Sequence, residues 1–199
     1  LSFSQGKLWL TLLLVALIAY ILGMGLPIST SYIILATLSA PAIVSLGVDM
    51  LVVHLTIFWF TQLATITPPV CMTAFAAAGI AQGQPMKTGF TALKMGFTFY
   101  YVPVLFVYSQ LINGAWWVQC IIAVFAIIAI YFLGTFTEKY FMGDLGNIQR
   151  FTGLAIFAAI YFMMFDGLTM PMRGALLALA VALIASLYIV QKKKQQAAA

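Results

Sequence analysis

The fold is decided by residues 50–82, which read MLVVHLTIFWFTQLATITPPVCMTAFAAAGIAQ. This run is apolar along most of its length, but Pro68 and Pro69 interrupt it. Two successive prolines remove two backbone N–H donors and disfavour helical angles at the residue before them, so a helix must break there. The sequence therefore predicts a discontinuous helix that is broken at residues 65–69, in the middle of a membrane.

The composition supports a membrane location. Of the 199 residues, 64% are apolar and only 7% are charged, whereas a soluble domain carries about 25% charged residues. Such a chain cannot build a water-exposed surface, which excludes a globular cytoplasmic enzyme. The net charge of +5 comes from scattered residues and from the lysines at 192–194. We therefore expect no nucleic-acid partner.

Two shorter apolar segments precede the broken helix. Residues 8–22 run into the sequence GMGLPIST at residues 23–30, and a second helix is expected at residues 31–46, with Pro41 inside it. The first segment is too short for a comfortable crossing, because about 20 apolar residues span the hydrocarbon core. Residues 8–46 are expected to form either a re-entrant hairpin or two short crossings, both of which return the chain to its starting side.

Plain apolar spans follow the broken helix. They are expected at residues 88–108, 115–136, 151–165 and 174–190. The chain begins at Leu1, without a Met and without the features of a signal peptide, so we expect it to be a fragment of a longer protein.

Basic residues predict which side of the membrane each loop occupies, because Lys and Arg accumulate in cytoplasmic loops. If residues 50–82 cross the membrane once, Lys7 and Arg173 lie on one side of the membrane. The opposite face receives Lys87, Lys94, Lys139, Arg150, Lys192, Lys193 and Lys194. We therefore expect this second face, and with it the carboxyl terminus, to be cytoplasmic.

Two interruptions at mid-depth indicate a binding site. Unpaired backbone in a bilayer is unfavourable unless it lines a cavity or packs in protein. Helix ends that meet at the midplane offer positive amino ends to an anion and free carbonyls to a cation. Ser29, Thr30 and Ser31 at one interruption, and Thr65 and Thr67 at the other, add hydroxyl oxygens. The alternative is a pair of kinked helices that pack without a ligand.

The sharpest site prediction places an ion between the two interruptions. Pro68 and Pro69 are expected to leave the carbonyl groups at residues 65–67 without hydrogen-bond partners. Gly23 and Gly25 are expected to let residues 23–30 approach that backbone closely. A sodium ion would then lie at Gly23, Thr65 and Thr67.

The single histidine, His54, shares a helical face with Phe58, Thr61 and Thr65, which leads to the break. It is either a hydrogen-bonded structural residue or a proton relay.

The remaining charged residues have simpler interpretations. Asp49 is expected to cap the helix that starts at Met50. Lys94 either extends to the interface or contacts substrate. Asp144 and Asp166 lie at different depths, which argues against an intramembrane aspartyl protease.

Seven sequence features, taken as an ordered set, resemble one family. They are GMGLP at 23–27, APA at 40–42, GVD at 47–49, His54, TPP at 67–69, FAAAGIA at 75–81 and KTG at 87–89. They look like the carboxy-terminal half of the large membrane subunit (DctM-like) of tripartite ATP-independent periplasmic (TRAP) transporters. The most similar variety is the fused permease that pairs with TAXI-type binding proteins, and the resemblance runs from about Leu8 to Tyr108.

The resemblance implies an all-α elevator-type transporter of the ion-transporter superfamily, built from inverted repeats. Residues 8–46 would be the re-entrant hairpin of the second repeat, residues 50–82 its broken helix, and residues 88–108 the helix that follows. Residues 1–112 would then form half of the transport core, and residues 113–199 a carboxy-terminal transmembrane extension with a basic tail.

The implied activity is ion-coupled uptake of small organic anions such as carboxylates across the bacterial inner membrane. The implied coupling ion is Na⁺ or H⁺. The implied partners are a periplasmic substrate-binding protein, the remaining half of the permease, the small-subunit region and membrane lipid.

Other classes of protein remain as alternatives. A non-transporting scaffold or assembly subunit would explain the plain spans after Ala115, but it needs no broken helix. A channel usually shows a polar lining stripe, which no span here carries. The sequence has no Gly-rich phosphate loop, metal-spaced His or Cys cluster, or nucleophile paired with a base, so neither an enzyme nor a cofactor is expected.

Overall fold

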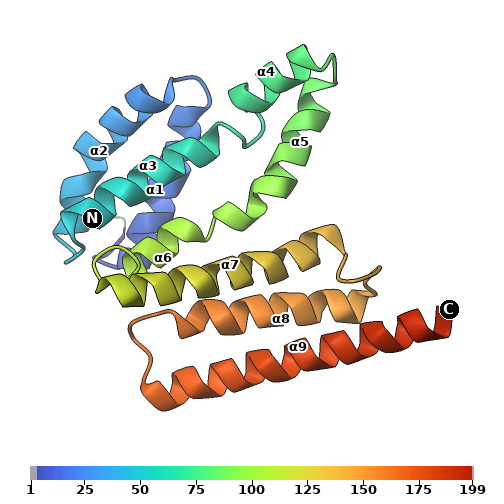
Figure 1. Cartoon of the computed structure of the whole chain (residues 1–199). Helices are drawn as coiled ribbons and strands as arrows, with labels where there is room; N and C mark the ends of the chain where they lie inside the picture. Colours follow the sequence, from blue (N-terminus) through green and yellow to red (C-terminus); the bar gives the residue numbers. More distant parts are fainter. Residues whose placement is uncertain (1–3, 199) are drawn as a thin grey trace. The chain divides into compact units, whose positions relative to one another are not determined.

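The computed structural model describes residues 4–198, and over this range the chain is helical with no β-strand. Contacts group the chain into two compact units, Leu1–Val107 and Tyr108–Ala199 (Figure 1). The functional division at residues 112 and 113 stays a prediction, because packing alone does not reveal which part transports.

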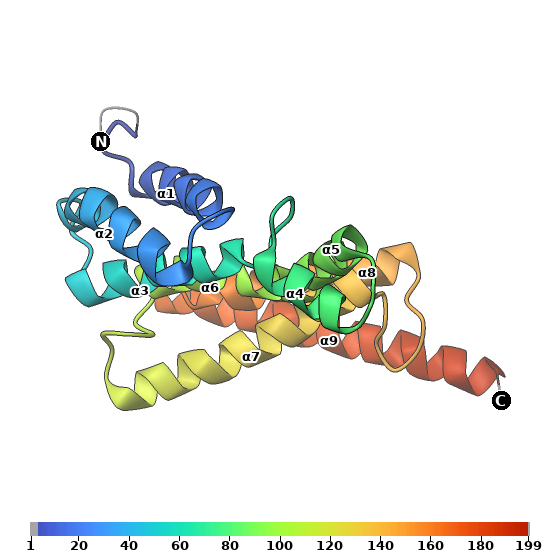
Figure 2. The same cartoon turned by 90° about the horizontal axis from the view of Figure 1, so that it is seen from above.

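Three helices pack pairwise at the start of the first unit: α1 (Leu8–Gly23), α2 (Ile28–Val44) and α3 (Met50–Ala64). Their shared core contains Leu35 and Ile43 from α2 and Val53 and Ile57 from α3, all fully buried. The chain turns back between α1 and α2 and forms a helical hairpin (Figure 2). Whether this hairpin is re-entrant depends on its position in the membrane and stays a prediction.

The turn of the hairpin is shorter than the sequence suggested. The second helix was expected from residue 31, but α2 begins at Ile28, directly after Pro27. Proline is favourable there because its ring sets φ near −65° and its missing N–H would have no partner at a helix start. Ser29 and Thr30 therefore lie in the first turn of α2, not in the connecting loop.

The broken helix is confirmed. Asp49 caps α3 as predicted, since its Oδ1 accepts from the N–H groups of Leu51 and Val52 at 2.9 and 3.4 Å. The helix ends at Ala64, and a second piece, α4 (Met72–Ile80), starts beyond the prolines.

The span expected at residues 88–108 is present as the helical stretch Pro85–Tyr108, but it is not one plain helix. The segment consists of α5 (Pro85–Gly96), a 3₁₀ turn (Phe97–Phe99) and α6 (Val102–Tyr108). The physical reason is Pro103, which cannot donate to the carbonyl of Phe99 four residues earlier and would clash with it in a helix. The indole Nε1 of Trp59 donates to that carbonyl instead, at 3.1 Å.

The second unit consists mainly of three helices: α7 (Trp116–Glu138), α8 (Asn147–Met163) and α9 (Met170–Ala198). The middle helix, α8, packs against both others (Figure 1). The three spans predicted here are confirmed as helices. Both α8 and α9 begin before the predicted residues 151 and 174: the first turn of α8 is the polar stretch at residues 147–150, and α9 starts at Met170, ahead of Arg173.

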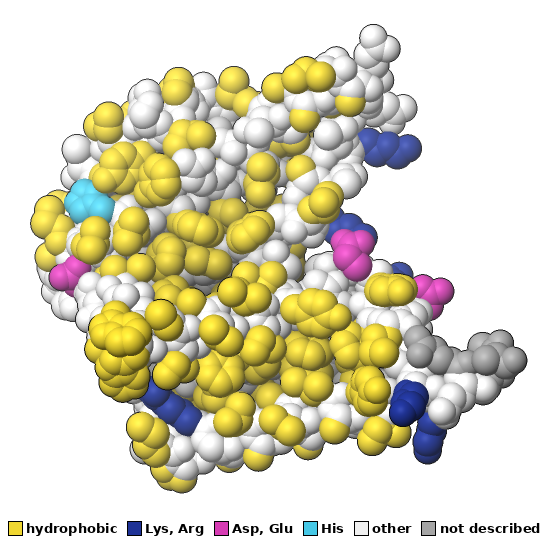
Figure 3. All heavy atoms as spheres, in the orientation of Figure 1, with side chains coloured by type: hydrophobic (Ala, Val, Ile, Leu, Met, Phe, Trp, Pro, Cys, Tyr) yellow, Lys and Arg dark blue, Asp and Glu magenta, His cyan; other side chains and the backbone are white. Residues whose placement is uncertain are grey.

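The surface of both units is apolar. Hydrophobic side chains cover most of the face in Figure 3, with charged side chains toward its edges. Among the described residues, three helical stretches are long and apolar enough to cross a membrane: Pro85–Tyr108, Trp116–Glu138 and Met170–Lys194. Exposed apolar residues such as Ile80 (88%) and Trp116 (76%) would be unfavourable in water. The chain is a membrane protein.

We predict its topology from the charge asymmetry. Single cysteines at Ser45 and Asn113 should react with a membrane-impermeant thiol reagent from outside, and those at Gln84 and Asn147 only after the membrane is opened. Ser45 is preferable to Gly47, whose φ of +90° would strain a cysteine.

The labelling background should carry Cys120→Ser, because this native thiol is exposed, whereas Cys71 is buried. Labelling of Gln84→Cys from outside in intact cells would contradict a single crossing by the broken helix.

Candidate functional site

The candidate site lies where α3 ends. The N–H groups of residues 65–67 donate to the carbonyl oxygens three residues earlier, at 3.1 to 3.3 Å. These bonds tighten the last turn and satisfy the carbonyls of residues 62–64, which the end of the helix would otherwise leave open. The free carbonyls at the break are those from residue 65 onward, which the prolines were expected to leave without partners.

The two threonines of the break add to this closure. Thr65 donates its hydroxyl to the carbonyl of Gln62 at 2.8 Å, and Thr67 donates to that of Leu63 at 2.6 Å. The hydroxyl of Thr67 also contacts that of Tyr100. A hydroxyl that donates its proton keeps lone pairs on its oxygen, so both threonines can still offer an oxygen to a cation.

The backbone also stays unpaired beyond the threonines. Within residues 4–198, no hydrogen bond is made by the carbonyl oxygens of residues 68–70 or by the N–H groups of residues 72–74. The first set lies in the loop that follows α3, and the second set is the amino end of α4. Acceptors that suit a cation and donors that suit an anion are thus only a few residues apart.

The hairpin comes close to the end of α3 at Gly23. A Cβ atom at Gly23 would lie 2.2 Å from the Cβ of Ala64, which only a glycine avoids. Ser31, which is buried, donates to the carbonyl of Leu22 at 3.4 Å and so ties the start of α2 to the end of α1. Gly23 thus packs closely against Ala64, the last residue of α3, while its role at an ion site stays a prediction.

The other residues predicted to lie at the turn of the hairpin and to approach the break are Gly25, Ser29 and Thr30, and none of them is placed like Gly23. A Cβ at Gly25 would meet nothing within 4 Å, so the expectation of a close approach there is wrong. Ser29 and Thr30 are exposed on the first turn of α2. The reason is the early start of α2 after Pro27, which turns these side chains onto the surface. Their role as ligands stays a prediction.

Three residues beside the break were missed by the sequence analysis. Tyr100 pairs with Thr67 from the interrupted segment between α5 and α6. Gly89 and Gly96, two turns apart on α5, let this helix pass close to the break: Cβ atoms there would lie 2.5 Å from the Cys71 sulfur and 2.6 Å from an Ile66 carbon. Two glycines seven residues apart indicate a close-packed helix face, and this spacing could have predicted the close approach of α5.

His54 lies on α3 well before the break. Its Nδ1 is 2.9 Å from the hydroxyl of Tyr32 on α2, so it links these two helices. Thr61, on the face predicted to lead from His54 to the break, donates its hydroxyl to the carbonyl of Phe58 at 2.7 Å. The hydrogen-bonded histidine is thus present, while the proton relay stays a prediction.

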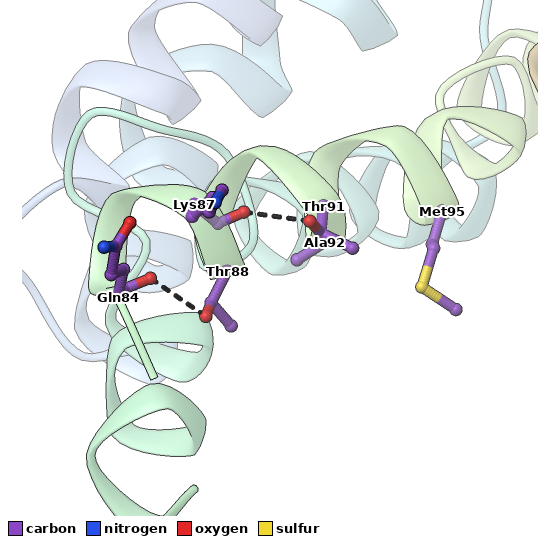
Figure 4. Close-up of a pocket in the computed structure, with 6 residues that line it drawn as sticks. All are labelled: Gln84, Lys87, Thr88, Thr91, Ala92 and Met95. Carbon is purple, nitrogen blue, oxygen red and sulfur yellow. Dashed lines mark hydrogen bonds between the residues drawn. The ribbon is translucent and has the colours of Figure 1, made fainter. Parts of the chain in front are cut away.

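An open hollow of about 440 Å³ lies on the polar face of α5 (Figure 4). The hydroxyls of Thr88 and Thr91 donate back to the carbonyls of Gln84 and Lys87, at 3.0 and 2.9 Å. The hollow is lined by α5 alone and is open to the surface, so it is a weaker candidate than the break. Lys94 is exposed on α5, and both interpretations of this residue stay open.

The described residues contain no group of three or more His, Cys, Asp or Glu side chains that could hold a metal ion. The oxygens available at the break are carbonyl and hydroxyl oxygens, which are ligands for hard cations.

The fold and the break define a class: a helical membrane protein with discontinuous helices of the kind that secondary transporters use for binding. The family model "Tripartite ATP-independent periplasmic transporter, DctM component" matches residues 1–113, more than half of the chain, and the chain belongs to this family. No curated protein and no solved structure matches the chain. This family consists of transporter components and is not an enzyme family.

Proposed function

We propose that this chain forms part of the permease of an ion-coupled secondary transporter that takes up small organic anions such as carboxylates. A periplasmic binding protein delivers the substrate, and the other half of the permease and the small-subunit region complete the complex. The single observation that carries this proposal is the break between α3 and α4. A subunit that serves only as a scaffold has no need for it.

The chemistry of the break supports coupling to a cation. The loop after α3 presents unpaired carbonyls at residues 68–70, next to hydroxyl oxygens of Thr65 and Thr67. Gly23 allows the end of α1 to close this side of the site. Oxygen ligands of this kind suit Na⁺, whereas coupling to H⁺ would assign the proton to His54.

The amino ends of α2 and α4 support binding of an anion. Each ends in N–H groups that its own helix leaves unpaired, and the helix dipole places partial positive charge there. We propose that a substrate carboxylate binds at these ends, in the arrangement of the second inverted repeat of an elevator transporter. The hairpin of α1 and α2 would be re-entrant.

We extend the proposal to the second unit. Residues 113–199 are proposed to be the carboxy-terminal extension of a fused permease of the TAXI-associated type, with the carboxyl terminus in the cytoplasm. The apolar surfaces of α7 and α9 and the basic residues at 192–194 support this placement.

The ion site is tested by Thr67→Val in the complete transporter, reconstituted in proteoliposomes. Removal of one ligand oxygen should raise the sodium concentration for half-maximal uptake by about tenfold, since a hydrogen bond or ligand of this kind contributes roughly 1–1.5 kcal/mol. Ser29→Ala should raise it as well, because the Ser29 hydroxyl is proposed as a further ligand of the ion.

The matched control is Tyr100→Phe. This variant removes the partner of the Thr67 hydroxyl without removing a proposed ligand, so its sodium dependence should stay near that of the wild type. Equal shifts in Thr67→Val and Tyr100→Phe would assign the effect to packing. Unchanged sodium dependence in both Thr67→Val and Ser29→Ala, at equal protein levels, would reject the ion site.

A further inference from the structure

The second unit contains a cavity of about 480 Å³ that transport at the break does not use. It lies where α7 and α9 begin and α8 ends. One wall is the face of α7 formed by Trp117, Ile121 and Phe125, which are spaced four residues apart. The opposite wall is α9, with Gly174 and Leu177. The lining is thus a long apolar surface that runs along two helices.

One end of this cavity is charged. Arg173 donates from its Nη2 to the carbonyl of Phe165 at 2.9 Å, and the same nitrogen is 3.8 Å from Oδ1 of Asp166. Its Nε is buried and has no hydrogen-bond partner among the described residues. A buried donor of a charged group without a partner is unfavourable and is rare in native proteins. The Arg173 side chain as a whole is 32% exposed and lines the cavity, so the accessible part of its guanidinium can donate to an acceptor that a ligand brings into the cavity.

The second charged group of the lining is Asp166. Its side chain is 45% exposed, and at 3.8 Å its contact with Arg173 is too long for a good hydrogen bond. The charged side chains in the lining are therefore one cation and one anion, and their charges cancel. A ligand with a matching head would carry one negative and one positive group.

The position of the cavity indicates the source of such a ligand. Trp116 and Trp117, at the start of α7, are 76% and 56% exposed. Tryptophans that are exposed at the end of an apolar helix are typical of the headgroup level of a bilayer. A cavity with a charged end at this level and an apolar wall along the helices matches the shape of a lipid.

We propose that this cavity binds a phospholipid with a zwitterionic phosphoethanolamine headgroup. The lipid phosphate accepts a hydrogen bond from Arg173, and the headgroup ammonium lies next to Asp166. One acyl chain lies along the wall formed by Trp117, Ile121 and Phe125. This site is independent of the proposed ion and substrate site in the first unit.

Two pairs of variants test the site in the purified complete transporter. Gly174→Leu should fill the cavity without disturbing the fold, because a Cβ at Gly174 meets nothing within 4 Å. Its control is Gly134→Leu on α7, where a Cβ also meets nothing within 4 Å but the residue is outside the cavity lining.

Arg173→Gln removes the phosphate ligand. Its control is Arg150→Gln, which removes another arginine that donates to a backbone carbonyl, that of Phe136, at 2.6 Å.

The measurement is a titration of the delipidated transporter with phosphatidylethanolamine or phosphatidylglycerol in detergent, followed by native mass spectrometry. The wild type and both controls should bind one phosphatidylethanolamine in preference to phosphatidylglycerol. Gly174→Leu and Arg173→Gln should each weaken this binding by about tenfold, the loss expected for a filled cavity or a charged hydrogen bond.

Three results would overturn the proposal. The first is unchanged phosphatidylethanolamine binding in Gly174→Leu, with a melting temperature equal to that of the wild type. The second is equal binding of the two lipids by the wild type, which would reject the zwitterionic match. The third is absence of any bound lipid in the wild type, which would assign the cavity to another protein segment.

Discussion

Replacement of Gly23 by leucine is expected to abolish substrate uptake and to lower the melting temperature of the protein. The backbone of α1 passes so close to the end of α3 that even a Cβ atom at this position would lie 2.2 Å from the Cβ of Ala64. Ala64 is buried and cannot move aside. A leucine must therefore push the hairpin away from the break, which opens the proposed site. Overpacking of this kind costs about 1–3 kcal/mol or more of stability.

The close contact also provides a control and a rescue. Gly25→Leu places the same side chain two residues away, in open space, and should leave both uptake and melting temperature near the wild-type values. The milder variant Gly23→Ala should be partly rescued by Ala64→Gly, which removes the opposing methyl group. Equal damage by Gly23→Leu and Gly25→Leu, or no rescue by Ala64→Gly, would contradict the contact as the cause.

Uptake by vesicles that contain only the membrane component is expected to fall to the background rate. In the proposed mechanism, the membrane site takes substrate from a periplasmic binding protein and not from bulk water. The donor and acceptor groups of the break are mostly single backbone groups. Such a site binds weakly by itself, because each neutral hydrogen bond contributes only about 0.5–1.5 kcal/mol net. The binding protein would supply the high affinity and the local concentration.

The measurement is uptake of labelled substrate into proteoliposomes under a sodium gradient, with and without the purified binding protein. A binding protein loaded with a different ligand is the matched control and should not restore uptake. Uptake at the full rate without any binding protein would reject this part of the proposal, while the variants at Thr67 would still test the ion site.

Several features of the fold follow from short stretches of sequence. The break after α3 was predicted from Pro68 and Pro69, because a proline acts on its own backbone and on the residue before it. The cap of α3 was predicted from Asp49, whose carboxylate reaches N–H groups two and three residues later. In each case the physical cause lies within a few residues of its effect.

One local signal was overlooked. Pro103 interrupts the segment between α5 and α6 by the same chemistry that breaks α3, although it is a single proline inside an otherwise apolar run. The expectation of a plain span gave more weight to apolar length than to the missing N–H. The indole of Trp59 then pairs with the carbonyl that Pro103 leaves open, and no sequence pattern connects these two residues.

Local backbone chemistry and composition were thus enough to predict a membrane protein with a helix broken at residues 65–69. The partners of the residues at that break were beyond such reasoning. Gly23 and Gly25 look equivalent along the chain, yet only Gly23 meets Ala64. Likewise, Tyr100 reaches Thr67 from a segment 33 residues away. Such contacts depend on how the helices cross and rotate against one another, which is set by the packing of many side chains at once.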